Sequence, residues 1–336
     1  MYTTRPRATA SLASRTSSPA RPVFTPVPAA IEPTTADEPT KDTKMREKLL
    51  DFVCPYSPDS VHQNLANARA KDSGTWLFTL PVFEKWQKTN TADDAGAVDG
   101  SRSNCIWLSG NLGAGKTMLM SAVIDHLLAS VKTLPEEKRK KTAVLYYYFD
   151  HSLPSGPKDA IASLLRQLCS QKNTGPLPRF LADNLATMKA APNLEGDSSD
   201  KITKNAGEGP LAPIPMGDMI ADFLSLQLRF DSVYICLDGL EECGDLVALF
   251  ELLVRLVTSS SPSRLVLSAR SQVVEPGIAA KIGSKDMVVN LEQHNAPDIR
   301  SYLETYTKKH DCLADMIGPE ALSGHIKLLA ERSGGK

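Results

Sequence analysis

A segment of eight residues, 110–117, carries residue types that can bind the phosphates of a nucleotide. Its sequence, GNLGAGKT, matches the pattern GxxxxGK[ST] at every fixed position. Glycine lets the backbone curl so that successive N–H groups face the phosphates, which a Cβ atom would obstruct. Lys116 can then reach the β- and γ-phosphates, and the Thr117 hydroxyl can bind Mg²⁺. The residues predicted to bind the nucleotide are Gly110, Asn111, Leu112, Gly113, Ala114, Gly115, Lys116, Thr117 and Met118.

The residues on either side of this loop fit a strand and a helix. Residues 105–109, CIWLS, form a short apolar run that is typical of a buried parallel strand. Apolar residues continue after the loop, over 118–124, at helical spacing. A strand, a glycine loop and a helix are the order that a phosphate-binding loop requires. This context disfavours the alternative, a glycine-rich turn that matches the pattern by chance.

A second apolar run ends in a carboxylate. Residues 233–237, VYICL, read as a buried strand and are followed by Asp238, the predicted partner of Mg²⁺. Glu241 and Glu242 come next, and either could orient or deprotonate an attacking water. The alternative is that these two glutamates cap a helix predicted to begin near Gly244.

A third apolar run, residues 265–267, leads into Arg270. Ligands of parallel sheets bind beyond the carboxyl ends of the strands, so Arg270 is expected to face the γ-phosphate and to respond to its presence. A surface salt bridge is the alternative. His151, after the strand predicted over 143–149, could also line the cleft, although a solvated loop position is the simpler interpretation.

Composition limits the classes of protein that the chain can belong to. The chain has 336 residues, of which 42% are hydrophobic and 23% charged, as in soluble proteins with one large or two ordinary domains. A formal net charge of -1 argues against a general nucleic-acid binder. No run approaches the roughly 18 apolar residues of a membrane span. Six cysteines without CxxC spacing favour buried thiols over disulfides or metal ligands, and therefore a cytoplasmic location.

Strands alternating with helices predict an α/β fold with a mostly parallel sheet and crossovers. Together with the phosphate-binding loop, this pattern leads us to expect a P-loop NTPase three-layer sandwich with a five-stranded sheet. Residues 1–43, rich in Ser, Thr, Pro and Ala, are predicted to be disordered; their arginines also resemble a transit peptide, which the prolines disfavour. Residues 44–100 are predicted to form a helical segment and linker, in which Trp76 and Trp86 pack in the core, with stacking on a ligand as the alternative. Residues 101–294 form the predicted core, and residues 295–336 begin a helical subdomain.

Taken together, the segments GNLGAGKT, YYYFDH, LLRQLC, VYICLDGLEEC and LVLSAR resemble the NACHT domain of STAND-class P-loop NTPases. The resemblance is to fungal NLR-like proteins, which often carry ankyrin or other repeats. It covers the chain from about residue 51 to the end and includes the segment GTWLF with the following FEKW.

This resemblance implies a central P-loop strand, with the Arg270 strand between it and the Asp238 strand. It implies ATP or ADP and Mg²⁺ as ligands, slow ATP hydrolysis, and a switch of the innate-immunity or self/non-self type that associates with itself when ATP is bound. Asp238 and Glu242 would form the metal-binding and water-activating pair, with Arg270 as the sensor. The absence of an NKxD-type motif favours adenine.

Two features depart from the family pattern. Glu241 stands where the family has Asp, which keeps the carboxylate and lengthens its reach. The sequence ends at Lys336, where the family continues into a winged helix with a nucleotide-locking histidine, so we expect a truncated sequence or a minimal paralogue without autoinhibition. A turnover ATPase or kinase, and a scaffold with a vestigial nucleotide site, are the alternatives to a switch.

Overall fold

The structure is a computed structural model. It describes residues 41–88, 104–150, 155–171, 175–190, 213–258, 262–273, 282, 285–309 and 318–332. The predictions made for residues 1–40 and for His151 lie outside these ranges.

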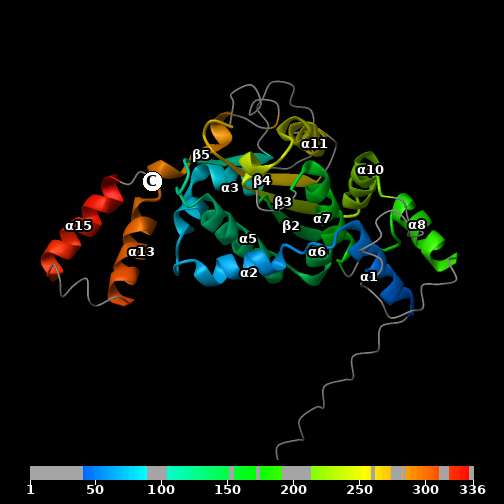
Figure 1. Cartoon of the computed structure of the whole chain (residues 1–336), viewed down its shortest axis with the longest axis horizontal. Coiled ribbons are helices and arrows are strands. Elements are labelled where there is room, and N and C mark those ends of the chain that lie inside the picture. The colour runs from blue at the N-terminus through cyan, green and yellow to red at the C-terminus, as the bar shows by residue number, and fades with distance from the viewer. Residues whose placement is uncertain are drawn as a thin grey trace, which may run out of the picture. The chain divides into compact units, whose positions relative to one another are not determined.

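Five parallel strands form one sheet in the order β2-β3-β4-β1-β5 (Figure 1). The strands are β1 (Cys105–Ser109), β2 (Thr142–Tyr148), β3 (Ser232–Asp238), β4 (Ser263–Ala269) and β5 (Val288–Asn290). As expected, β4 lies between β1 and β3, so Arg270 follows the strand next to both the P-loop strand and the Asp238 strand. The middle strand is β4 rather than β1, because only the short β5 pairs with the other side of β1.

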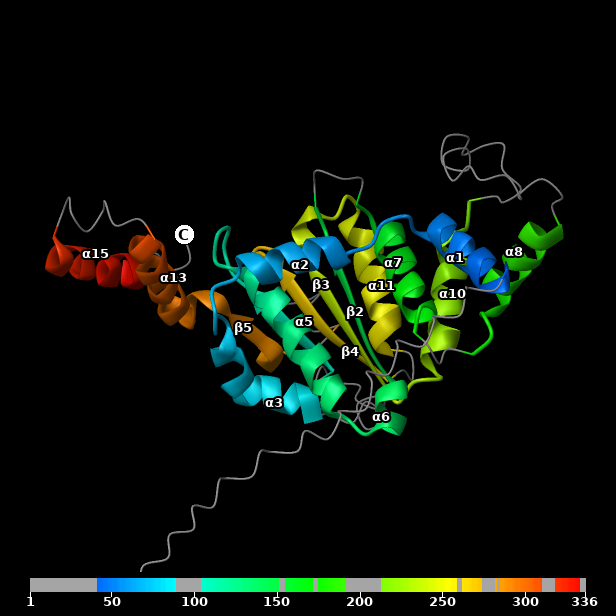
Figure 2. The same cartoon turned by 90° about the horizontal axis from the view of Figure 1, so that it is seen from below.

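Helices cover both faces of the sheet, because alternate residues of each strand point to opposite sides. Ile106 and Leu108 pack with α5 (Lys116–Thr133), whereas Trp107 packs with α7 (Pro157–Cys169) and α11 (Leu246–Thr258). Figure 2 shows α5 on one face of the strands and α7 with α11 on the other. This arrangement confirms the three-layer α/β sandwich. The remaining elements of this core are α6 (Glu136–Lys140), α8 (Arg179–Ala190) and α10 (Met216–Gln227).

The described part of the segment before β1 is helical and packs against the core. It consists of α1 (Lys41–Val53), α2 (Asp59–Ala68), the 3-10 turn η1 (Thr75–Thr79) and α3 (Pro81–Lys88). Helix α1 begins three residues before the predicted start of this segment at residue 44, and its Leu49, Leu50 and Val53 are buried. Trp86 is fully buried, as predicted for a core residue.

A partly buried polar network fixes α2 on α5 and β2. The ring of His62 in α2 lies 2.9 Å from the Tyr148 hydroxyl through Nδ1, and 3.2 Å from Asp125 through Nε2. Just beyond the end of α2, Arg69 donates to the second oxygen of Asp125 at 2.6 Å and to Ser121 at 2.7 Å. Buried polar groups such as the His62 ring need hydrogen-bond partners. These contacts therefore hold the end of α2 against α5.

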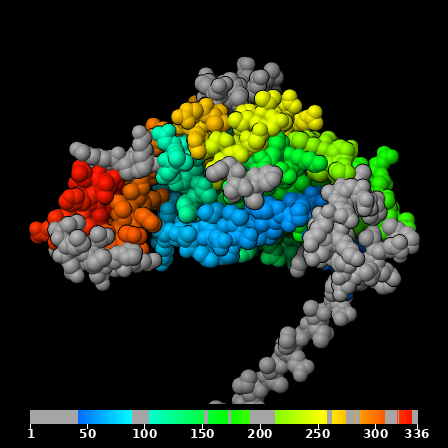
Figure 3. All heavy atoms as spheres, viewed as in Figure 1, coloured from blue at the N-terminus to red at the C-terminus, as the bar shows by residue number. Residues whose placement is uncertain are grey.

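Two helices follow the sheet in the described part of the chain. They are α13 (Ala296–Lys309) and α15 (Pro319–Arg332), and they pack against each other. In the space-filling view the orange atoms of α13 lie beside the blue and cyan segment before β1 (Figure 3). Among the described helices none combines the length and the apolar character needed to cross a membrane. The five cysteines in the described ranges are buried thiols rather than disulfides, as predicted.

Candidate functional site

The glycines of the P-loop adopt backbone conformations that few other residues tolerate. Gly113 and Gly115 have φ angles of 82° and 90°, in the left-handed region. A Cβ at Gly110 would lie 2.9 Å from the Cβ of Ala114, closer than side chains pack. Helix α5 begins at Lys116, immediately after Gly115, so its N-terminus adjoins the loop. The loop and the helix dipole together form an anion-binding arrangement.

Lys116 is held inside this loop. Its Nζ donates to the carbonyl oxygens of Gly110 at 3.0 Å and Asn111 at 3.1 Å. The same Nζ lies 3.6 Å from Oε1 of Glu241, and both side chains are almost completely buried. The structure therefore brings together the predicted phosphate-binding lysine and one of the two predicted glutamates.

Thr117 and Asp238 meet beside Lys116. The Thr117 and Ser268 hydroxyls both donate to the Asp238 carboxylate, and Ser268 in turn accepts the Gly239 N–H at 2.9 Å. Burial raises the pKa of Asp238 to about 6, and the two hydroxyl hydrogen bonds and the Lys116 charge counteract this shift only partly.

The oxygen atoms of Thr117 and Asp238 fit Mg²⁺, which prefers oxygen ligands. This ion usually keeps several water and phosphate oxygens and takes only one or two ligands from the protein. A cation beside Asp238 would also offset the cost of burying its carboxylate. Within the described ranges, no group of three or more His, Cys, Asp or Glu side chains is arranged to hold a metal. Thr117 and Asp238 are thus the residues that would hold Mg²⁺, together with oxygens from the nucleotide.

Glu241, rather than Glu242, faces Lys116. Gly239 has a φ of 71°, and after it the 3-10 turn η2 (Leu240–Glu242) directs the Glu241 side chain to Arg270. Glu241 Oε2 accepts the Arg270 backbone N–H at 3.1 Å, and Oε1 lies 3.2 Å from Arg270 Nε. The half-buried Glu242 lies against Gly239, with its Cδ 3.9 Å from where a Cβ on that glycine would be.

The sequence left two alternatives open: a helix cap for Glu241 and Glu242, and a surface salt bridge for Arg270. Helix α11 is capped by Asp245, whose carboxylate accepts the Ala248 N–H at 3.0 Å, so Glu241 does not serve as its cap. Arg270 forms a salt bridge, but its partner is Glu241 inside the site, although 40% of the Arg270 side chain is exposed.

Three residues after β5 contact the site and were not predicted from the sequence. In the turn η4 (Leu291–Gln293), Glu292 Oε1 accepts the N–H of Asn111 at 3.0 Å. The buried Asn295 donates its side-chain N–H to the carbonyl of Ala114 at 3.1 Å. Asp298 belongs to the cavity described next. A usable signal was present, because these polar residues follow a strand whose carboxyl end lies at the same sheet edge as the P-loop.

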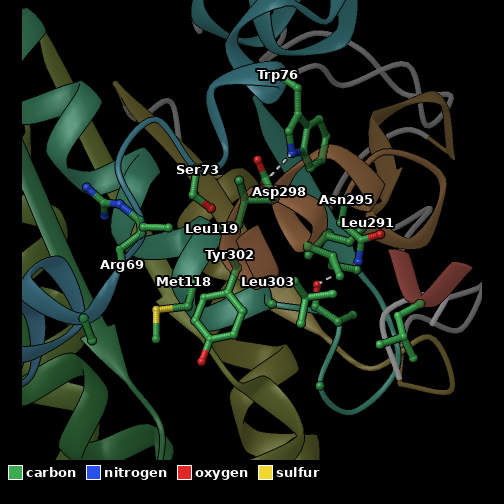
Figure 4. A pocket seen from close by; sticks show the side chains of 17 residues that line it. Arg69, Ser73, Trp76, Met118, Leu119, Leu291, Asn295, Asp298, Tyr302 and Leu303 are labelled. Carbon is green, nitrogen blue, oxygen red and sulfur yellow. Dashed lines mark hydrogen bonds between the residues drawn. The ribbon is translucent and has the colours of Figure 1, made fainter. Parts of the chain in front are cut away.

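A cavity of about 410 Å³ opens beside the P-loop (Figure 4). Its walls come from four separate segments of the chain and are mostly apolar. They comprise residues 68–76, the P-loop with the start of α5, and residues 291–303, with Leu329 of α15. Met118 lines this cavity, whereas Leu112 is not among the residues that line it and its side chain is exposed.

Asp298 joins two walls of the cavity. Its Oδ2 accepts the Gly74 N–H and the Trp76 indole N–H, each at 2.9 Å. The indole ring also stacks on His294, with the ring centroids 5.0 Å apart. Figure 4 shows the indole nitrogen turned toward Asp298. Trp76 was predicted to pack in the core; it is partly buried there and also forms part of the cavity wall.

Comparison with known families identifies the module. Residues 72–270 match the model of a family described as nephrocystin 3, N-terminal. This match covers more than half of the chain and includes the P-loop, Asp238 and Arg270. The chain belongs to the nephrocystin 3 N-terminal family. This family membership confirms a P-loop NTPase module of the NACHT type, as the motifs indicated.

Two further proteins are similar to this member of the nephrocystin 3 N-terminal family. The vegetative incompatibility protein HET-E-1 of Podospora anserina is 26% identical over 243 residues, which are 71% of this chain and 13% of HET-E-1. The Orc1 protein of Aeropyrum pernix, solved in complex with DNA, matches with a TM-score of 0.37 and 16% identity. That match covers 79% of this chain and 53% of Orc1. At this TM-score the likeness does not bear on function.

Proposed function

We propose that this module binds ATP with Mg²⁺, hydrolyses it slowly, and acts as a nucleotide-dependent signalling switch. The observation that carries the proposal is the convergence of Lys116, the Thr117–Asp238 pair, Glu241 and Arg270 at the N-terminus of α5. Each of these groups has a use in phosphate chemistry, and they come from three neighbouring strands of one sheet.

The roles follow from position. The N–H groups of residues 113–118 and the Lys116 ammonium bind the phosphates, while Thr117 and Asp238 hold the metal. Glu242 or Glu241 positions the attacking water, and Arg270 contacts the γ-phosphate.

The base and ribose would occupy the cavity beside the P-loop. Its volume of about 410 Å³ lies within the usual range for small-molecule sites. Trp76, Leu291 and Met118 provide apolar wall, and the loop glycines 113 and 115 line the same cavity. ATP fits this arrangement, because a planar base can lie against apolar walls while the phosphates extend along the loop.

A switch requires that the ligand distinguish two arrangements of the protein. The cavity supplies a physical basis for this, because Asn295 and Asp298, at the start of α13, contact the P-loop and the segment before β1. A nucleotide in the cavity would therefore touch the helices α13 and α15 as well as the P-loop. We extend the proposal to self-association of the ATP-bound module in the cytoplasm, in a recognition role of the innate-immunity or self/non-self type.

A turnover ATPase or kinase is the alternative enzyme class. A kinase needs a cationic lid over the phosphates, and the densest basic run, residues 138–141, lies elsewhere. It precedes β2 and so lies at the amino end of a parallel sheet whose carboxyl end carries the P-loop. A vestigial scaffold is disfavoured because Lys116, Thr117 and Asp238 remain in contact distance of their partners.

The experiment measures oligomeric state and hydrolysis together. Light scattering after gel filtration, in ATP and in ADP, is compared for the wild type and Glu242→Gln, and phosphate release is followed in parallel. We expect the variant to retain ATP and to accumulate the larger species. Glu242 is the predicted water-activating residue, so its replacement would slow the hydrolysis that resets the switch. Turnover near the enzyme median of about 10 per second, with no nucleotide-dependent change in size, would favour the turnover enzyme instead.

A further inference from the structure

We propose that Glu241 sets the preference of this site between nucleoside diphosphate and triphosphate. Its carboxylate holds both cations that a γ-phosphate would use, so it opposes the third phosphate more than the first two. This inference rests on the proposed nucleotide-binding function and deepens it.

One carboxylate contacts the two cations directly. Glu241 Oε1 lies 3.6 Å from Lys116 Nζ and 3.2 Å from Arg270 Nε, and Oε2 accepts the Arg270 backbone N–H at 3.1 Å. The side chains of Glu241 and Lys116 are only 10% and 9% exposed. Water therefore screens this pair weakly, and the charges act on one another more strongly than a surface pair would.

The turn that carries Glu241 is fixed, so the carboxylate cannot move far from this position. Leu240 is fully buried, and the Glu242 N–H donates to the Gly239 carbonyl at 2.8 Å. Gly239 itself approaches the Phe149 carbonyl, which would lie 3.3 Å from an added Cβ. The turn follows β3 and Arg270 follows the adjacent β4, so strand pairing also places the two side chains together.

The charge balance at the loop explains the expected preference. Glu241 and Asp238 place two carboxylates beside Lys116. The two carboxylates repel each other, since the Glu241 charge contributes to the raised pKa of Asp238. A γ-phosphate would bring further negative charge to the cations that Glu241 already holds. A diphosphate ends one group earlier and meets less of this repulsion. Neutralising Glu241 should then favour the triphosphate selectively.

The test compares the dissociation constants of ADP and of a non-hydrolysable ATP analogue by calorimetry, at one fixed Mg²⁺ concentration. The variants are Glu241→Gln, Glu241→Asp and, as a matched control, Glu251→Gln, which removes the same charge from an exposed glutamate of α11. We expect Glu241→Gln to raise the preference for the triphosphate about tenfold, the effect of one charge at a partly screened contact. Glu241→Asp keeps the charge but shortens the reach, so its ratio should lie between those of the wild type and Glu241→Gln. Glu251→Gln should leave the ratio unchanged.

The outcomes separate this inference from the proposed function. Wild-type protein that binds neither nucleotide would refute the proposed function itself. Wild-type binding of both nucleotides, with the same ratio in Glu241→Gln, would overturn the role of Glu241. Glu241→Asp covers the case in which Glu241→Gln does not fold, because a ratio unchanged from the wild type in that variant would also count against the proposal.

Discussion

Replacing Asp298 by alanine should open the cavity beside the P-loop. The Asp298 carboxylate accepts two hydrogen bonds of 2.9 Å, from the Gly74 N–H and the Trp76 indole N–H. These donors lie more than 220 residues away in the sequence, so the contacts join α13 to the segment before β1. In Asp298→Ala both donors lose their acceptor.

The magnitude follows from the two contacts. A hydrogen bond to a charged group contributes about 1.5–3 kcal/mol, and we take the lower value because Asp298 is only partly buried. Two such bonds give about 3 kcal/mol, which corresponds to roughly a 100-fold change in a local opening equilibrium. Asp298→Asn keeps an oxygen acceptor without the charge and should show a smaller effect.

Hydrogen–deuterium exchange of peptides that cover residues 72–78 measures this opening directly. We expect exchange in Asp298→Ala to be faster by about two orders of magnitude, with exchange in β3 unchanged. Asp183→Ala, which alters an exposed aspartate of α8, provides the control and should not change exchange in residues 72–78. Wild-type protection of the Gly74 amide in Asp298→Ala would refute the assignment of this contact.

Two further predictions concern the stability of the core. Burial raises the pKa of Asp222, which accepts the Leu181 N–H at 3.0 Å. The folded state therefore binds this proton more tightly than the unfolded state, and the stabilisation present at low pH is lost as pH rises from about 4 through the folded pKa. Chemical denaturation across pH should show that the free energy of unfolding of Asp222→Asn increases relative to that of the wild type as pH rises. A difference between the two free energies that stays constant with pH would contradict this. Gly239→Ala should cost about 1–2 kcal/mol in thermal unfolding, because φ is 71° and the Cβ would meet the Phe149 carbonyl, and wild-type stability would contradict the strain.

Most of the fold could be predicted from the sequence because its signals are local. Apolar runs that end in Asp238 and Arg270, and the glycine loop after 105–109, mark buried strands and the polar residues at their carboxyl ends. Parallel pairing then brings those ends to one edge, as the order β3-β4-β1 shows. The polar residues that follow the short β5 were not predicted to belong to the site.

Contacts that depend on tertiary packing could not be predicted in the same way. Asp298 meets Trp76 only because α13 packs beside the segment before β1. The choice between Glu241 and Glu242 depends on the direction of one 3-10 turn after a left-handed glycine, and adjacent residues of the same type give no sign of it. Helix α1 begins in the polar residues 41–43, where no apolar spacing marks the start.

Calorimetric binding of ATP in the presence of Mg²⁺, for the wild type and for Lys116→Ala, tests the central claim most directly. Lys116 lies inside the P-loop, bonded to its carbonyls and paired with Glu241, so its loss removes the positive charge on which the phosphates depend. The account predicts saturable one-site binding in the wild type and no measurable binding in a folded Lys116→Ala variant. Equal affinity in the two proteins would contradict it.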